Sequence, residues 1–249
     1  VLVSNPNVID LCFDKFATTS LAESELGFNV PKTFFFPEQA IEQIKQGNLD
    51  FPLIVKPRWG SASIGIYKAE NVEQLQLGWK LLSLNINHSG LRCDDSDGKN
   101  ILIQECVKGD EYGVDIVNDL NGSCRAVFVK KKISMRAGET DQALVVENKQ
   151  IVELGSKIGN YLKHIGNLDC DFFIDNNKIT LLEMNPRFGG GYPFSEAAGV
   201  NVPKAIVSWI KNKEPESGWD EITYGVSSAK CDRLVVTNDN KKITRKYYE

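Results

Sequence analysis

The chain has 249 residues, and its 42% hydrophobic content is enough for one large domain or for two closely packed lobes. Its 29 basic and 33 acidic residues give a net charge of -4 and are interspersed, so no basic surface indicates a nucleic-acid or membrane partner. No apolar run approaches the ~18 residues that a bilayer-spanning helix needs. We therefore expect a soluble globular protein that holds any anionic ligand in a local site.

Six cysteines are widely scattered, with no CxxC pair and no cysteine-histidine cluster spaced as metal ligands would be. This pattern is typical of reduced thiols and predicts a cytoplasmic protein. Because the sequence starts at Val1 rather than at methionine, we also expect it to be a piece of a longer protein.

The first hundred residues are expected to mix helices with short strands. In chain order, the predicted elements are a helix that ends at Gly27, an extended stretch through Pro31, a helix that ends at Gly47, a strand at 51–57, a helix at about 72–84 and a polar loop at 87–100.

The rest of the chain is expected to be richer in strands. Its predicted elements are the strands ILIQECV, EYGVDIV and SCRAVFVKKKI, a helix at about 148–164, the strands DCDFFI and TLLEMN, a helix at about 203–211, and two or three strands within 216–249. Helices with short strands, followed by a strand-rich body, predict an α+β fold in two lobes.

The segment LLEMNPRFGGGY places polar side chains inside a run that otherwise predicts a buried strand. Because side chains alternate along a strand, we expect Leu181, Glu183 and Asn185 to lie on one face, while Leu182 and Met184 point into the core. The alternative is an edge strand whose polar face is simply solvated.

A second acidic residue, Asp171, precedes this strand in the segment DCDFFI. Asp171, Glu183 and Asn185 offer the oxygen ligands that Mg²⁺ prefers. Opposed residues of an antiparallel pair share a face, so these ligands meet only if the connecting loop is odd or the ladder carries a bulge. We predict a three-residue loop or a bulge, with an asparagine in the left-handed region. A two-residue turn at Asn176 and Asn177 with an unbulged ladder would separate them.

Three other segments carry groups suited to phosphates or nucleotides. Arg187, before three glycines, is suited to a phosphate or an acyl phosphate, unless it is merely solvated. Lys56 ends a strand before the loop Gly60 to Ser63, whose backbone N–H groups could wrap phosphate oxygens, although an ordinary loop explains it as well. The segment QECVKGDE could bind an adenine edge through its backbone and a ribose through Glu111, or could form an ordinary charged hairpin.

Taken in this order, these elements resemble the ATP-grasp superfamily. The resemblance is carried by DK, GFNVPKT, FPLIVKP, QECVKGDEY and LLEMNPR. The loop KPRWGSASIGIYK is similar to that of D-alanine-D-alanine ligases, whereas EMNPR resembles the form in carbamoyl phosphate synthetase large chains, biotin carboxylases and carboxylate-amine ligases. The resemblance implies an α+β fold of two lobes, each with an antiparallel sheet and helices, around a nucleotide site. It also implies a small lid subdomain at 12–104, a large subdomain at 105–249, and an N-terminal domain that we expect to be missing here.

The same resemblance implies roles for individual residues. Lys15 and Lys56 would hold ATP phosphates, and a lid would be formed by Ser61, Ala62 and Ser63. Adenine would be contacted by Glu105 and Val107, and the ribose would be bound by Glu111. Mg²⁺ (or Mn²⁺) would be bound by Asp171, Glu183 and Asn185, and Arg187 would stabilise the transferring phosphoryl group. Arg136, Glu139 and Thr140 are further candidates for contacting the carboxylate substrate, although a charged loop is a comparable interpretation.

The family chemistry implies an ATP- and Mg²⁺-dependent ligase that activates a carboxylate as an acyl phosphate for attack by an amine. Its partners would be small carboxylate and amine substrates, with no nucleic acid or membrane, and a homodimer stays open. One alternative is a carbamoyl phosphate synthetase-like protein that phosphorylates bicarbonate or carbamate. Another is a nucleotide-binding module without turnover.

Overall fold

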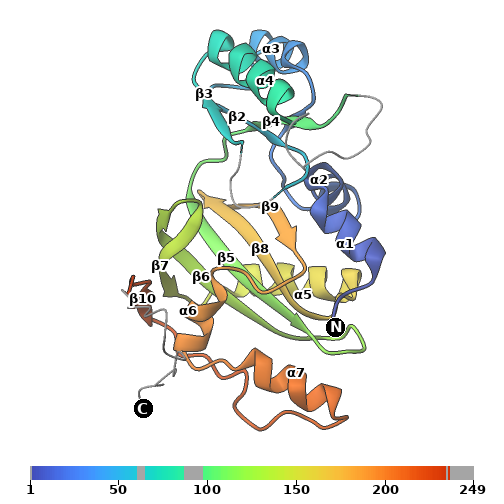
Figure 1. Cartoon of the computed structure of the whole chain (residues 1–249), viewed down its shortest axis with the longest axis vertical. Helices are drawn as coiled ribbons and strands as arrows, with labels where there is room; N and C mark the ends of the chain where they lie inside the picture. The colour runs from blue at the N-terminus through green and yellow to red at the C-terminus, as the bar shows by residue number, and fades with distance from the viewer. Residues whose placement is uncertain (1, 61–64, 87–97, 234, 236–249) are drawn as a thin grey trace, which may run out of the picture.

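The chain folds into a small lobe and a large lobe, as Figure 1 shows for the computed structural model. The structure describes residues 2–60, 65–86, 98–233 and 235. Each lobe contains one antiparallel sheet with helices packed on it, which confirms the predicted α+β fold. No helix among these residues has the length and apolar character needed to cross a bilayer.

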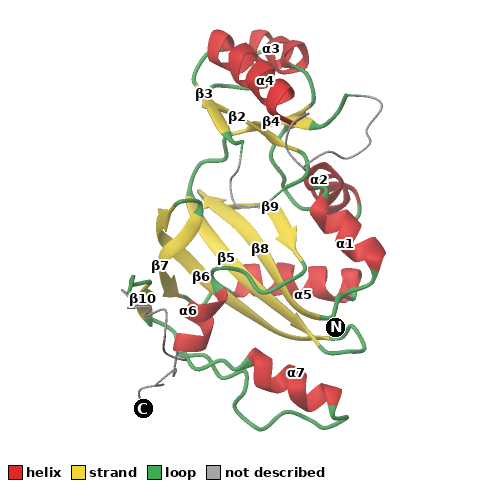
Figure 2. Ribbon diagram, viewed as in Figure 1, coloured by secondary structure: helices red, strands yellow, loops and turns green. Residues whose placement is uncertain are grey.

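The small lobe is a four-stranded sheet in the order β1-β4-β2-β3. Its elements are β1 (Thr33–Phe34), α3 (Pro37–Lys45), β2 (Leu53–Pro57), β3 (Tyr67–Ala69), α4 (Val72–Ile86) and β4 (Ile101–Glu105). The two helices lie on the outer side of this sheet (Figure 2). Apolar residues of α4, such as Leu75 and Leu82, share a buried core with Leu53 and Val55 of β2, which fixes the strand that carries Lys56.

The large lobe is a six-stranded sheet in the order β10-β7-β6-β5-β8-β9. Its elements are β5 (Asp110–Asn118), β6 (Cys124–Arg136), β7 (Glu139–Val145), α5 (Lys149–Leu162), β8 (Gly166–Asp175), β9 (Lys178–Asn185), α6 (Tyr192–Ala197), α7 (Val202–Ile210) and β10 (Ser227–Ala229). Alternate residues of the central strands, such as Val114 and Cys170, share one core with Ile151 and Ile158 of α5. Their neighbours along the strands therefore face the opposite side of the sheet, where polar residues gather.

Two N-terminal helices, α1 (Pro6–Phe13) and α2 (Lys15–Ser24), pack against the large lobe. Cys12 and Ala22 belong to the same buried core as Met184 of β9. The predicted boundary, which placed residues 12–104 together, therefore differs from the packing, because the apolar faces of these helices are covered by the large sheet rather than by the small one. Asp14 starts α2 by accepting hydrogen bonds from the N–H groups of Phe16 (3.0 Å) and Ala17 (3.2 Å).

Two sets of contacts lie where the lobes join, and the first continues the pairing of β1 with β4. At the first, two segments that connect the lobes lie side by side: the N–H of Glu105 donates to the carbonyl of Lys32 (2.9 Å), and the N–H of Lys32 donates to the Glu105 carboxylate (3.2 Å). At the second, Arg58, which follows β2, donates to both carboxylate oxygens of Asp14 at 2.8 and 2.6 Å.

Several short elements were not predicted from the sequence. They are α1, β1, β3, β7 and α6. The segment around Glu139, for which a charged loop was the alternative interpretation, continues from a tight turn at Ala137 and Gly138, which have φ of 51° and 80°, into β7. Within 216–233 the structure has one strand, β10, and residues 236–249 lie outside the described part of the chain.

Candidate functional site

The hairpin of β8 and β9 brings the predicted metal ligands to one face. Its turn has two residues, Asn176 and Asn177, with φ of 46° and 69°, so the three-residue loop is wrong. The bulge is confirmed: the register shifts by one residue between Asp171 and Phe172, so that Asp171 lies opposite Glu183. Both turn asparagines adopt the predicted left-handed conformation.

The bulge also corrects the predicted faces of β9. Leu181, 1% exposed, and Met184 are buried in the core, whereas Leu182 lines the cavity beside Glu183. Strict alternation had placed Leu181 on the polar face and Leu182 in the core. The extra residue of the bulge resets the alternation between them.

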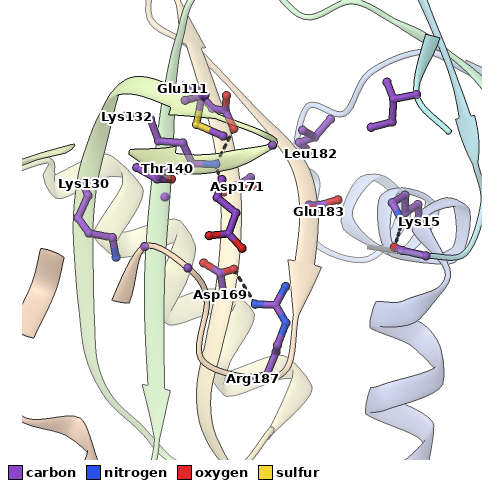
Figure 3. Close-up of a pocket in the computed structure, with 18 of the residues that line it drawn as sticks. Lys15, Glu111, Lys130, Lys132, Thr140, Asp169, Asp171, Leu182, Glu183 and Arg187 are labelled. Atoms are coloured by element: carbon purple, nitrogen blue, oxygen red, sulfur yellow. Dashed lines mark hydrogen bonds and ion pairs between the residues drawn. The ribbon is translucent and has the colours of Figure 1, made fainter. Parts of the chain in front are cut away.

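A cavity of about 540 Å³ is lined by both lobes and contains most of the predicted site (Figure 3). The predicted residues that line it are Lys15, Lys56, Glu111, Glu139, Thr140, Asp171, Glu183 and Arg187. Asn185 joins this group through its side-chain amide, which donates to Glu183 Oε1 at 3.2 Å.

The remaining predicted residues lie elsewhere. Glu105 and Val107 line a separate cavity of about 310 Å³ beside the connecting segments, so the described geometry does not bring the predicted adenine contacts into the main cavity. Arg136 is not among the residues that line the main cavity, because its guanidinium pairs with Asp141 (2.9 Å) and Asp232 (2.5 Å). The predicted lid residues Ser61, Ala62 and Ser63 lie outside the described residues.

Two lysines mark one end of the main cavity. Lys15, the first residue of α2, donates to the carbonyl of Gly60 at 2.5 Å. Burial lowers the pKa of Lys15, partly offset by the charge of Glu183. Lys56 is 5% exposed, and burial lowers its pKa to about 8, although the charge of Glu183 partly offsets this effect. Ammonium groups held in this way are suited to phosphate oxygens.

Lys132 on β6 lines the same cavity, although the sequence reasoning gave it no role. Its ammonium lies 2.6 Å from Glu111 Oε1 and 2.7 Å from Asp171 Oδ1, and so joins the predicted ribose carboxylate to a predicted metal ligand. Burial alone would lower the pKa of Lys132, but the charges of Asp171 and Glu111 outweigh it and raise that pKa. Burial raises the pKa of Asp171 to about 7 despite the lysine.

A buried polar network supports the glycine segment that follows Arg187. Lys130 forms a very short ion pair with Asp115 and lies 3.0 Å from Ser195 Oγ, which donates to Asp115 at 2.7 Å. Asn167 donates to Asp115 (3.2 Å) and to the carbonyl of Arg187 (3.4 Å). The network therefore connects three strands of the sheet to α6 and to the backbone of Arg187.

The donor set at β8 and β9 fits a hard divalent cation. Asp171 and Glu183 are opposed carboxylates, and Asn185 adds a carboxamide, while the nearby lysines are suited to substrate phosphates. In the described part of the chain, no group of three or more His, Cys, Asp and Glu side chains is arranged to hold a metal ion. The fit therefore depends on a mixed set of two carboxylates, one amide and phosphate oxygens.

Two antiparallel lobes, a polar cavity lined by two lysines, and opposed carboxylates on a bulged hairpin define an ATP-grasp protein. The family model described as "ATP-grasp in the biosynthetic pathway with Ter operon" matches residues 97–231. The chain belongs to this family.

Curated relatives and solved structures show the same relationship. The chain is 27% identical to the carbamoyl phosphate synthase large chain of Thermoanaerobacter sp. over 92% of this chain and 22% of that protein. It is 25% identical to the D-alanine--D-alanine ligase of Bacillus pumilus over 78% of this chain and 56% of that protein.

The fold matches the biotin carboxylase domain of Hydrogenobacter thermophilus 2-oxoglutarate carboxylase with a TM-score of 0.73 and 15% identity, over 90% of this chain and 51% of that one. That structure is a domain dimer in complex with MgADP, ADP and bicarbonate. The chain thus spans between about a fifth and about half of the length of these proteins.

Proposed function

We propose that this chain is the nucleotide-binding and catalytic part of an ATP- and Mg²⁺-dependent ligase that activates a carboxylate as an acyl phosphate for attack by an amine. The observation that carries the proposal is the single cavity in which Lys15, Lys56, Glu183 and Arg187 converge. Phosphoryl transfer needs mainly positioning and charge neutralisation, which these groups supply without a nucleophilic side chain.

Each residue has a defined part in this proposal. Lys15 and Lys56 bind phosphate oxygens of ATP at one end of the cavity, and Glu111 is suited to the ribose hydroxyls. Arg187 is 52% exposed in the cavity and is suited to the negative charge that grows on the transferring phosphoryl group. Asp171, Glu183 and Asn185 would hold Mg²⁺, which supplies charge neutralisation at the phosphates when bound.

The support from the relatives lies in the kind of reaction that their names indicate, not in a high sequence identity. Proteins named D-alanine--D-alanine ligase and carbamoyl phosphate synthase large chain match most of this chain. Phosphorylation of bicarbonate or carbamate is the second candidate, favoured by the match to carbamoyl phosphate synthase large chains. Small-molecule substrates are common to both candidates. A cytoplasmic location and a homodimer, the latter favoured by the dimeric biotin carboxylase domain, complete the proposal.

Phosphate release by the full-length protein tests the proposed function. The protein is incubated with Mg²⁺-ATP and panels of small carboxylates and amines, and phosphate is measured with each acid alone and with each acid and amine together. Release that one acid and one amine stimulate together supports the ligase. Release stimulated by bicarbonate alone would favour the second candidate, and nucleotide binding without stimulated release would favour a module without turnover.

Nucleotide affinity is expected to depend on the charge of Lys56. Because the pKa of Lys56 is lowered to about 8, its ammonium loses a proton as the pH rises through 8, and the Kd for Mg²⁺-ATP should rise about tenfold between pH 7 and pH 9. The measurement is fluorescence or calorimetric titration at fixed ionic strength. Lys56→Arg, which stays charged, should lose this pH dependence. A wild-type Kd that does not change over this range would contradict the role of Lys56.

A further inference from the structure

Asp169 is an acidic side chain of the cavity to which neither the sequence reasoning nor the family relationship gave a role. It lies on β8 two residues before Asp171, on the same face, and opposite Asn185 of β9. Its side chain is 15% exposed, and its carboxylate points toward that of Asp171 at the centre of the site (Figure 3). A charged group in this position is adjacent to the proposed reaction centre.

The segment after Arg187 is built closely around this carboxylate. A Cβ atom on Gly189 would lie 2.1 Å from Cγ and 2.2 Å from Oδ2 of Asp169, so only glycine lets the backbone approach it. Arg187 Nη1 donates to Asp169 Oδ2 at 3.2 Å. Asp169 and the group proposed to contact the transferring phosphoryl are therefore neighbours.

The nearby lysines already have anionic partners in the described structure. Lys130 is paired with Asp115, and Lys132 is paired with both Glu111 and Asp171. Asp169 has one ion pair, with the half-exposed Arg187. A carboxylate that faces the cavity favours a cationic group beside it.

We propose that Asp169 binds the ammonium form of the amine substrate and sets it beside the acyl phosphate that Arg187 contacts. This inference rests on the proposed ligase function and identifies the second substrate as a protonated amine. In the reaction, the amine nitrogen forms the C–N bond to the acyl carbon, the C–O bond breaks, and phosphate leaves with that electron pair. The ammonium nitrogen loses one proton to water before attack, which frees the lone pair that forms the C–N bond, and it loses a second proton to the leaving phosphate afterwards.

Hydroxylamine separates this inference from the proposed function. It is uncharged at neutral pH and converts an acyl phosphate to a hydroxamate without needing an ammonium site. The full-length protein is given Mg²⁺-ATP, a panel of small carboxylates, and either hydroxylamine or a panel of amino acids and ammonium. Hydroxamate and amide are then measured separately.

Asp169→Asn is expected to lower the ratio of amide to hydroxamate about 10- to 100-fold, chiefly through a higher KM for the amine. Gly189→Ala, which keeps the carboxylate but displaces it, should lower the ratio in the same direction. Asp141→Asn is the matched control, because Asp141 pairs with Arg136 and is not among the residues that line the cavity. If Asp169→Asn does not fold, Gly189→Ala decides.

The outcomes distinguish failure of the proposed ligase function from failure of the role of Asp169. If the wild-type protein forms no hydroxamate with any carboxylate, the proposed function fails, and the role of Asp169 falls with it. If hydroxamate forms but the ratio of amide to hydroxamate is unchanged in both variants, the role of Asp169 alone is rejected. If hydroxamate forms but no amine yields an amide, the amine-ligase part of the proposed function is rejected as well. A raised Kd for Mg²⁺ in Asp169→Asn at an unchanged ratio would assign this carboxylate to the metal instead.

Discussion

Replacing Glu183 with alanine is expected to abolish Mg²⁺-dependent ATP turnover while the fold remains intact. Glu183 lies opposite Asp171 in the β8–β9 hairpin and faces the cavity that contains Lys15 and Lys56. Loss of one preorganised electrostatic group at a reaction centre commonly lowers kcat by at least about 100-fold. The measurement is ATP-dependent phosphate or hydroxamate formation at saturating Mg²⁺.

Stability measurements make this prediction more specific. Glu183→Ala relieves the repulsion between the directly opposed carboxylates of Asp171 and Glu183, but it also removes the negative charge beside Lys15 and Lys56. The variant should therefore unfold at nearly the same urea concentration as the wild-type protein. Glu23→Ala, at an exposed position of α2, is the control and should change neither property. Wild-type turnover in Glu183→Ala would reject the proposed metal site, whereas loss of activity together with loss of folding would point to a structural role.

Replacing Lys130 with methionine is expected to lower the free energy of unfolding by about 3–5 kcal/mol. Lys130 and Asp115 have side chains that are 1% and 0% exposed, so the change leaves a buried carboxylate without its cation. Ser195 and Asn167 still donate to that carboxylate, which favours the lower end of the range. The measurement is urea unfolding followed by circular dichroism.

Two further variants test the physical reason. Lys130→Met combined with Asp115→Leu should recover much of the loss, because an apolar pair replaces both buried charges. Lys204→Met removes one partner of the exposed pair Lys204–Glu216, whose side chains are 54% and 75% exposed, and should cost less than about 1 kcal/mol. Equal losses in Lys130→Met and Lys204→Met would contradict the role of burial.

The sequence predicted the fold class and most of the long elements, because their signals are local. Gly27 and Gly47 follow helices and adopt the positive φ that their positions suggested. The spacing of Asp171 and Glu183 around two asparagines required either an odd loop or a bulge. The structure uses the bulge, which local pattern alone could not place at Leu182.

The rest of the site depends on strand order, which the sequence pattern did not determine. Lys132 reaches Asp171 because Gly113 of β5 lies opposite Asp171 on one side and Lys130 on the other, so no side chain stands between β6 and β8. The interest of Asp169 depends on the close packing of the Gly189 backbone against its carboxylate, which the sequence pattern does not show. In the sequence, these residues belong to a lysine run and a strand of mixed polarity.

The two sets of contacts where the lobes join have a consequence for ligand entry. One set is the pair of hydrogen bonds between Lys32 and Glu105, and the other is the bidentate ion pair between Asp14 and Arg58. They lie at separate points of the connection between the lobes. Rigid-body swinging of the small lobe about the first point would break the second. The parts of the chain that carry Lys15 and Lys56 are therefore preorganised. Little of the binding free energy of a nucleotide is needed to bring them into position.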